Sequence, residues 1–248
     1  MTTLHLPVVS IIIPIHNEKN NIGEVINDFK KLNQREWEII VVDDGSSDGS
    51  KDEIDTEFVR LITHNTNLGK GEAIKSGIQN AKGKFIVLMD GDGQDVPNDI
   101  LKLLGLMNKG EVDLVIGARF KGNIIKNLNM HIREGSVQVI NYFGNILLTM
   151  LINVLLNIRI TDSQAGFKCM ELAKAKELQL NAKGFEIETE ILIHASKKKW
   201  IIKEVEVTRK SRVHGSSDLY DIRFGRIVFG LKVLRIILKN ILKGEKNG

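Results

Sequence analysis

The sequence has little or nothing of several features that mark other classes of protein. Its 248 residues include one cysteine, Cys169, which excludes an internal disulfide and allows a reducing compartment. Aromatic residues make up only 5% of the chain, and no basic stripe with interleaved aromatics occurs, so nucleic-acid binding is poorly supported. The start lacks the basic segment of a signal peptide, and Pro14 interrupts the first apolar run.

Two nucleotide-binding fingerprints are also absent. No GxGxxG follows the first apolar run, which counts against a nicotinamide or flavin enzyme. The Gly-Lys-Gly at 69–71 lacks the spacing of a phosphate-binding P-loop. What is present is the composition of a folded protein, 42% hydrophobic and 27% charged, without repeats or low-complexity linkers. The net charge of +4 suits phosphate-bearing partners or an anionic membrane surface.

The first half alternates between apolar, β-branched runs and helical stretches. Strands are expected at Val8–Ile15, Glu38–Val42, Phe58–Ile62, Phe85–Met89 and Leu114–Ile116, and helices at Asn20–Leu32, Lys70–Asn80 and Pro97–Asn108. Near-continuous apolar strands separated by helices predict an α/β fold, with a mostly parallel sheet flanked by helices on both faces. Ligands bind at the carboxyl ends of such strands, where the polar clusters of this sequence fall.

The second half is less regular. It predicts a long apolar segment at 133–158, a compact stretch at Thr161–Met170, a helix at Ile187–Lys198, a strand at Ile201–Thr208 and a last helix at Asp221–Lys243. No domain boundary is evident, so we expect one domain over residues 1–220, followed by a basic amphipathic helix within 221–248.

The strongest chemical signal is Met89-Asp90-Gly91-Asp92-Gly93-Gln94-Asp95. Asp90 and Asp92 directly follow a predicted buried strand, so both carboxylates can face one Mg²⁺ or Mn²⁺ ion. Such an ion can neutralise the charge that grows on a departing nucleoside diphosphate. The alternative is a surface turn rich in Asp and Gly.

Two further polar segments lie at the ends of predicted strands or the start of a helix. In Val42-Asp43-Asp44-Gly45-Ser46, the carboxylates could accept hydrogen bonds from a base or ribose, although a helix cap or polar turn explains them too. In Asn67-Leu68-Gly69-Lys70-Gly71, Lys70 and the open amides could face phosphate.

Together these segments resemble the family 2 glycosyltransferases of GT-A fold. The resemblance rests on Ile11-Ile12-Ile13-Pro14-Ile15-His16-Asn17-Glu18, Val42-Asp43-Asp44-Gly45-Ser46, Gly69-Lys70-Gly71 and Leu88-Met89-Asp90-Gly91-Asp92. Within that family, the segments 90–97, 116–120, 162–168 and 184–188 resemble dolichyl-phosphate and polyprenyl-phosphate hexosyltransferases. The resemblance covers about residues 8–219.

The resemblance implies a role for each matching position. It places the donor nucleotide sugar against Pro14, His16, Glu18, Asp43, Asp44, Lys70, Asp90 and Arg119, the metal on Asp90, Asp92 and Gln94, and the acceptor phosphate on Arg133 and Arg212. Asp92 and Arg119 would be the catalytic residues. Asp218 stands where the family often has a lysine, which leaves the acceptor site open, and His16 leaves the base preference open.

The expected reaction is an inverting transfer of mannose or glucose from GDP-mannose or UDP-glucose to dolichyl or another polyprenyl phosphate. A lipid phosphate is already ionised, so positioning and stabilisation of the leaving diphosphate suffice. One alternative is a family 2 enzyme acting on a glycan or surface polymer, which needs a base such as Glu186, Glu188 or Glu190. A non-catalytic subunit is disfavoured by the intact Asp90 and Asp92 pair.

Two segments indicate contact with a membrane surface. Ser136–Ile158 carries no formal charge, yet polar residues recur every four positions, at Asn141, Asn145, Thr149, Asn153 and Asn157. This pattern favours an amphipathic helix, at the bilayer surface or packed on the domain, over a membrane span. In the last helix, Lys232, Arg235, Lys239 and Lys243 share one face, which could bind anionic lipid or be a solvated face of a docked helix. We expect a peripheral protein at the cytoplasmic face of a membrane, with a separate membrane subunit left open.

Overall fold

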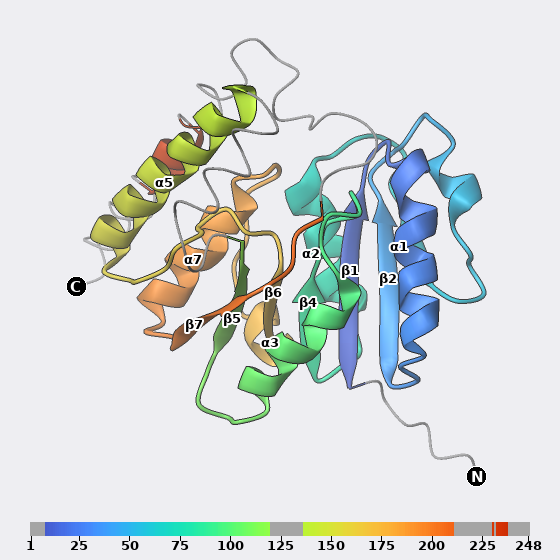
Figure 1. Cartoon of the computed structure of the whole chain (residues 1–248), viewed down its shortest axis with the longest axis horizontal. Helices are drawn as coiled ribbons and strands as arrows, with labels where there is room; N and C mark the ends of the chain where they lie inside the picture. Colours follow the sequence, from blue (N-terminus) through green and yellow to red (C-terminus); the bar gives the residue numbers. More distant parts are fainter. Residues whose placement is uncertain (1–7, 120–135, 211–229, 231, 238–248) are drawn as a thin grey trace.

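The computed structural model describes residues 8–119, 136–210, 230 and 232–237. A seven-stranded sheet forms its centre, with helices on both faces (Figure 1). The strands are β1 (Val9–Ile15), β2 (Trp37–Asp43), β3 (Arg60–Thr63), β4 (Phe85–Leu88), β5 (Leu114–Ala118), β6 (Lys168–Glu171) and β7 (Ile202–Glu206). The helices are α1 (Lys19–Leu32), α2 (Lys70–Asn80), α3 (Ile100–Met107), α5 (Ser136–Leu156), α6 (Leu172–Lys176) and α7 (Ile187–Lys197), with short 3₁₀ turns η1 (Ser50–Glu53) and η2 (Pro97–Asp99).

The sheet is mostly parallel, as the alternation of strands and helices predicts. The strand order is β3-β2-β1-β4-β6-β5-β7, and β6 is antiparallel to both of its neighbours. Strand β6 begins inside the stretch at Thr161–Met170, which was expected only to be compact, so its strand character is a finding of the structure. Because β4 and β5 are both antiparallel to β6, they run in the same direction and their carboxyl ends lie at one edge.

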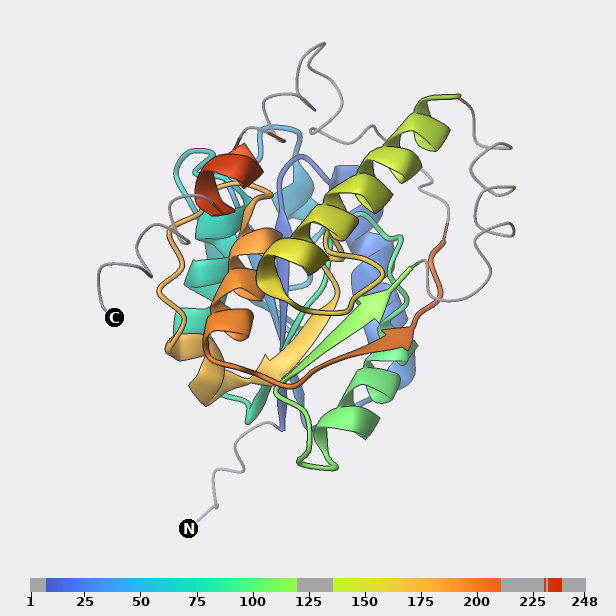
Figure 2. The same ribbon diagram turned by 90° about the vertical axis from the view of Figure 1, so that its left-hand side faces the viewer.

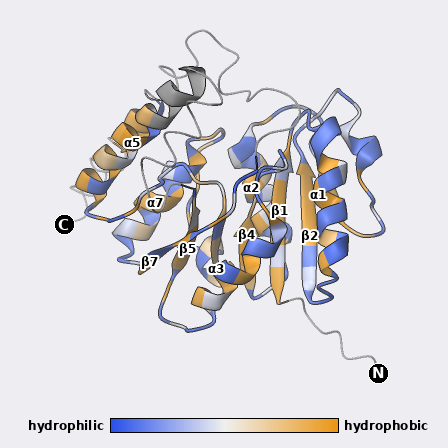
Figure 3. Cartoon of the chain, in the orientation of Figure 1, coloured by the Kyte–Doolittle hydropathy of each residue, from blue (hydrophilic) through white to orange (hydrophobic). Residues whose placement is uncertain are grey.

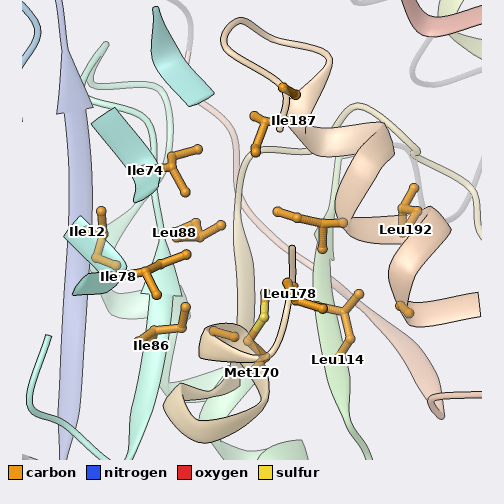
Figure 4. Close-up of a cluster of buried hydrophobic side chains, with 14 of the residues drawn as sticks. Ile12, Ile74, Ile78, Ile86, Leu88, Leu114, Met170, Leu178, Ile187 and Leu192 are labelled. Atoms are coloured by element: carbon orange, nitrogen blue, oxygen red, sulfur yellow. The ribbon is translucent and has the colours of Figure 1, made fainter. Parts of the chain in front are cut away.

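The sheet is buried on both faces, which explains why its strands are continuous apolar runs rather than alternating ones. Ile11 and Ile13 of β1 pack on the face covered by α1 and α3. Ile12 packs on the opposite face, in the cluster that includes Ile74 of α2 and Ile187 of α7 (Figure 4). Both faces are therefore closed to solvent, and polar chemistry is confined to the ends of the strands.

Helix α5 packs on the domain through its polar residues and turns apolar ones outward. Asn145, Thr149 and Asn153 all donate hydrogen bonds to the loop that leads into β6, at Asp162, Ser163 and Ile160. The outward side chains, Phe143, Leu147, Met150, Leu151, Val154 and Leu155, are 40% to 80% exposed. The helix lies at the end of the molecule away from α1 (Figure 1), and Figure 3 shows its hydrophobic stretches. The predicted amphipathic pattern is thus present where Asn145, Thr149 and Asn153 face the protein, whereas Asn157 of the predicted stripe is exposed beyond the end of α5.

None of the helices in the described part of the chain combines the length and apolarity needed to cross a membrane. In the predicted C-terminal helix, the described turn at 232–237 is helical, and Figure 2 shows it packed against the domain. Val233 and Ile237 are buried in the core there, while Lys232 and Arg235 are exposed. This turn matches the docked helix with a solvated charged face, and its contact with lipid stays a prediction.

Candidate active site

The predicted donor-side residues meet at the carboxyl ends of three neighbouring strands. Pro14 is the penultimate residue of β1, His16 and Glu18 follow within three residues of its end, and β1 lies between β2 and β4 in the sheet. Asp43 is the last residue of β2, and Ile15 is its partner on β1. Asp90 follows β4 within two residues. The register of three parallel strands therefore brings these positions to one edge, as the sequence predicts.

Asp43 and Asp44 are adjacent in sequence and differ in their contacts. The Asp43 side chain is fully buried; Oδ1 accepts the Ser46 amide, while Oδ2 has no hydrogen-bond donor within the described residues and lies 3.4 Å from Lys51 Nζ. A buried acceptor without a donor is costly, so Asp43 Oδ2 is suited to receive an N–H or O–H of a ligand.

Asp44 has both of its carboxylate oxygens engaged within the protein. Oδ1 accepts from the Leu68 amide at 3.0 Å and faces His64 Nδ1 at 2.6 Å, and Oδ2 accepts the Gly69 amide at 2.6 Å. These contacts hold the loop that leads into α2. Contact of Asp44 with a donor stays a prediction; within the protein, its carboxylate anchors the two residues that precede Lys70.

Lys70 is the first residue of α2, and its ammonium contacts Asp90 in the loop at 89–95, which carries the predicted metal ligands. Nζ lies 2.7 Å from Asp90 Oδ1 and 2.9 Å from Glu188 Oε1, and it sits over the Phe185 ring at 5.4 Å from the centroid. Burial alone would lower the pKa of Lys70, but the carboxylates of Asp90 and Glu188 outweigh it and raise that pKa above its usual range. The ammonium is therefore charged at neutral pH.

Of the three carboxylates in the 89–95 loop, the two predicted to bind the metal differ in their contacts within the protein. Burial alone would raise the pKa of Asp90, but Lys70 outweighs it and lowers the pKa to about 2. Asp92 Oδ1 accepts the Gln94 amide at 3.0 Å, and Oδ2 is 4.0 Å from the Arg209 guanidinium, beyond hydrogen-bond distance. The Asp90 carboxylate packs against the backbone of Gly166, where an added Cβ would lie 2.8 Å from both carboxylate oxygens.

Arg209 closes this loop from the end of β7. Its guanidinium donates to Gln94 Oε1 at 2.6 Å and to Asp95 Oδ1 at 3.4 Å. Burial raises the pKa of Asp95 to about 6; Arg209 opposes this shift, while Asp90 and Asp92 add to it. Because Gln94 offers its side-chain oxygen to Arg209, the role of Gln94 as a metal ligand stays a prediction without support from this geometry.

Arg119 follows β5 and is anchored by a buried carboxylate. Its Nε and one terminal nitrogen donate to Asp162 at 2.5 and 2.8 Å, and Asp162 also accepts from Asn145 of α5 at 3.1 Å. Burial alone would raise the pKa of Asp162, but the Arg119 charge outweighs it and lowers that pKa. This planar pair fixes the guanidinium in one orientation.

The other predicted positions divide into described and undescribed ones. His16 Nδ1 lies 3.1 Å from the Asp44 carbonyl oxygen, and Glu18 accepts from Asn21 at 2.6 Å, so both are held at the sheet edge where β2 ends in Asp43. Arg133, Arg212 and Asp218 lie outside the described residues, so the acceptor-phosphate assignments stay predictions.

The three glutamates at the start of α7 that could serve as a base, Glu186 just before the helix and Glu188 and Glu190 in its first turn, are engaged in contacts within the protein. Glu190 Oε2 accepts the Asn181 and Ala182 amides at 2.8 and 2.7 Å. Glu188 pairs with both Lys70 and the fully buried Lys168. Glu186 Oε1 accepts the Gly184 amide at 3.3 Å.

The donor atoms of this edge fit a hard divalent cation held with substrate phosphates. Among the described residues, no group of three His, Cys, Asp or Glu side chains is arranged to hold a metal. Asp90 and Asp92 supply two carboxylates beside a glycine backbone, and Mg²⁺ and Mn²⁺ commonly bind through one or two carboxylates plus phosphate oxygens. Of the three predicted metal ligands, the geometry is consistent with a role for Asp90 and Asp92, whereas the side-chain oxygen of Gln94 is bound to Arg209.

Sequence reasoning assigned no role to Asp162, Lys168 or Arg209. Asp162 and Lys168 lie in a segment that carried the family resemblance, and Lys168 interrupts an apolar run, which signals a buried ion pair. Arg209 had no local signal, because its partners lie at least 114 positions away.

Comparison with known proteins gives a consistent result. The family model described as Glycosyl transferase family 2 matches residues 10–176. Dolichol-phosphate mannosyltransferase of Pyrococcus furiosus is 32% identical over 220 residues, which cover 85% of this chain and 59% of that protein. Dolichyl-phosphate beta-glucosyltransferase of Saccharomyces cerevisiae is 26% identical over 226 residues, covering 81% of this chain and 66% of that protein.

Solved structures share the fold. Glucosyl-3-phosphoglycerate synthase from Mycobacterium tuberculosis, in complex with Mn²⁺, UDP and glucosyl-3-phosphoglycerate, matches with a TM-score of 0.69 at 20% identity. The match covers 94% of this chain and 80% of that one. The predicted GT-A architecture is thereby confirmed.

Proposed function

The chain belongs to glycosyl transferase family 2, and on that premise we propose that it transfers a hexose from a nucleotide-diphosphate sugar to a polyprenyl phosphate. The donor is GDP-mannose or UDP-glucose, the acceptor is dolichyl phosphate or a similar lipid, and the anomeric configuration is inverted. Relatives named for dolichyl-phosphate mannosyl and glucosyl transfer, and a structural neighbour that binds UDP with Mn²⁺, support this assignment.

The observation that carries the proposal is the link between the site and α5. Asp162 is shared by Arg119, at the sheet edge, and by Asn145, on the inner face of α5. The outer face of the same helix exposes Leu147 and Val154, at 70% and 80%. An apolar surface joined through one carboxylate to the guanidinium that faces the donor phosphates would bring a lipid chain next to the donor, which suits a lipid-phosphate acceptor.

On the donor side, the buried Asp43 oxygen accepts a hydrogen bond from the base or ribose, and His16 and Glu18 border that pocket. Asp90 and Asp92 would hold a divalent cation, which supplies neutralisation of the charge that develops on the leaving nucleoside diphosphate. Arg119, fixed by Asp162, adds a preorganised positive charge toward the donor phosphates.

On the acceptor side, the reaction requires no strong base. A phosphate oxygen that is already ionised attacks the anomeric carbon as the bond to the nucleoside diphosphate breaks, and no proton has to be removed. The involvement of Glu188 and Glu190 in structural pairs is consistent with this route and disfavours a hydroxyl acceptor, which needs a free carboxylate.

We place the protein peripherally at the cytoplasmic face of a membrane. The exposed apolar stripe of α5 would lie at the boundary between headgroups and acyl chains, as amphipathic interfacial helices do. The basic residues Lys232 and Arg235 would add attraction to anionic lipid. A separate membrane subunit remains compatible with this arrangement.

The test is transfer of radiolabelled sugar into organic-extractable lipid, with purified full-length protein, dolichyl phosphate and Mn²⁺ or Mg²⁺. Label from GDP-mannose or UDP-glucose should be lost in Asp92→Asn and in the presence of chelator. Asp55→Asn, at a surface ion pair with Lys30 ahead of the amino end of β3 and so at the opposite edge of the sheet from the site, is the matched control and should retain transfer. Absence of lipid label with both donors, despite nucleotide binding, would refute the acceptor assignment, and NMR detection of a retained configuration would refute inversion.

A further inference from the structure

We propose that Glu188 is a second acceptor for the Lys70 ammonium, which allows Lys70 to release Asp90 to a divalent cation. Glu188 would thus be a positioning residue that acts through Lys70. This role rests on the metal requirement of the proposed function, and it concerns how the protein's own charges are arranged before and after the cation binds.

Lys70 already contacts both carboxylates. Its Nζ lies 2.7 Å from Asp90 Oδ1 and 2.9 Å from Glu188 Oε1. Its side chain is 13% exposed, so the ammonium has little access to water. A small shift away from Asp90 therefore leaves Lys70 paired with Glu188 rather than uncompensated.

A cation on Asp90 makes such a shift necessary. The Lys70 ammonium already pairs with the Asp90 carboxylate. A divalent cation that binds the same carboxylate would therefore lie close to the positive charge of Lys70. Like charges at this separation repel strongly in a partly buried site. A buried ammonium without a carboxylate is also unfavourable. Glu188 removes the second cost, since it stays within reach when Asp90 turns to the cation.

The two partners are held in fixed relation by direct backbone contact. The Gly71 amide donates to the Lys183 carbonyl at 2.6 Å. A Cβ at Gly69 or Gly71 would come within 2.3 Å of the Lys183 or Ala182 carbonyl oxygen. The first turn of α2, which carries Lys70, is therefore packed onto the segment that leads into α7, and Glu188 cannot drift from Lys70.

Lys168 sets how much of the Glu188 charge is available. It is fully buried and pairs with Glu188 Oε2, so Glu188 is shared between two lysines. Loss of the Lys168 charge leaves Glu188 wholly to Lys70 and should ease its release from Asp90. Loss of both Lys168 and Glu188 charges leaves Lys70 with Asp90 alone and should oppose cation binding.

These opposite signs define the experiment. Mn²⁺ binding to the full chain is measured from the EPR signal of free Mn²⁺, with and without UDP or GDP, for the wild type and four variants. We expect about tenfold tighter binding in Lys70→Met, equal or tighter binding in Lys168→Met, and about tenfold weaker binding in Lys168→Met/Glu188→Gln. Lys75→Met, on the same helix and paired with Glu72, is the matched control and should bind Mn²⁺ as the wild type does.

A purely structural role for the pair would weaken Mn²⁺ binding in every variant or in none. The inference is overturned if Lys70→Met binds Mn²⁺ no tighter than the wild type, a result that stands even if the double variant fails to fold. If the wild type binds Mn²⁺ and transfers sugar, and every variant binds Mn²⁺ with the affinity of the wild type, the role of Glu188 is refuted while the proposed function stands. If the wild type binds no Mn²⁺ even with nucleotide, this inference and the metal requirement of the proposed function both fail.

Discussion

The donor side and the acceptor side of the site are held together by different means. On the donor side, the ends of three adjacent parallel strands carry the polar residues, and glycines allow backbone to lie directly on backbone. On the acceptor side, α5 is joined by side-chain hydrogen bonds to the loop before β6, and Asp162 of that loop connects it to Arg119. We therefore expect the free energy of unfolding to be insensitive to exchanges of polar side chains on the donor side and sensitive to added atoms there. On the acceptor side we expect the reverse.

The largest effect is expected from Asp162→Asn on the acceptor side. The substitution removes the counter-charge of Arg119 while leaving the guanidinium in a buried position, which typically costs about 3–5 kcal/mol. Urea unfolding should show this loss in the free energy of unfolding. The control is Asp28→Asn, whose ion pairs are on the surface and should contribute about 1 kcal/mol or less. Equal losses in the two variants would mean that the acceptor side does not depend on this buried pair.

Gly69→Ala tests the opposite property on the donor side. Gly69 has a φ of 100°, and a Cβ would lie 2.3 Å from the Lys183 carbonyl oxygen, so backbone strain and a clash coincide. We expect a loss of about 3 kcal/mol in the free energy of unfolding. Gly105→Ala in α3, where a Cβ meets nothing within 4 Å, should be neutral or stabilise by about 0.5–1 kcal/mol. A tolerated Gly69→Ala would show that the donor side is not built by backbone contact.

The same difference explains what could be predicted from the sequence. The apolar run Ile11-Ile12-Ile13 predicts a strand buried on both faces, and the start and end predicted for α2 agree with the structure, because these features follow from local pattern. The parallel order of strands then places Asp43 and Asp90 at one edge without further information.

Side-chain contacts across the chain could not be predicted in this way. The stripe that includes Asn145 and Thr149 indicates an amphipathic helix, but which face meets the protein depends on hydrogen-bonding partners in the loop before β6. Asp43 and Asp44 are identical in type, and it is the loop at 67–69 that donates to both oxygens of Asp44, whereas Asp43 Oδ2 has no hydrogen-bond donor among the described residues. The pairing of Arg209 with the 90–95 loop likewise depends on the completed sheet.

Leu147→Ser probes the outward face of α5. Leu147 is 70% exposed, so its loss should change the free energy of unfolding by no more than about 0.5 kcal/mol. Insertion of a leucine side chain into lipid is worth about 1.5 kcal/mol, so vesicle binding should weaken roughly tenfold. Sedimentation with vesicles containing anionic lipid measures this change. Unaltered vesicle binding would refute the proposal that the outward face of α5 contacts the membrane.

Thr149→Val is expected to destabilise the fold less than Asp162→Asn or Gly69→Ala and to give the sharpest comparison, because it removes one hydroxyl and little volume. Thr149 Oγ1 donates to Ser163 Oγ at 2.9 Å and accepts the Ser163 amide at 3.1 Å, and both residues are buried. The loss leaves a buried amide without its acceptor and should cost about 1 kcal/mol in the free energy of unfolding. Thr149→Ser keeps the oxygen and should retain most of that stability.

The kinetic consequence of Thr149→Val separates support of the loop from simple packing. Ser163 adjoins Asp162, so a loosened loop lets the Arg119 guanidinium depart from its fixed orientation, and transfer by Thr149→Val should fall severalfold while Thr149→Ser stays near the wild type. Steady-state transfer assays at saturating donor measure this difference. If Thr149→Val loses stability but keeps full transfer, the link from α5 to Arg119 stabilises the fold without positioning the guanidinium, and the acceptor side would owe its geometry to β5 alone.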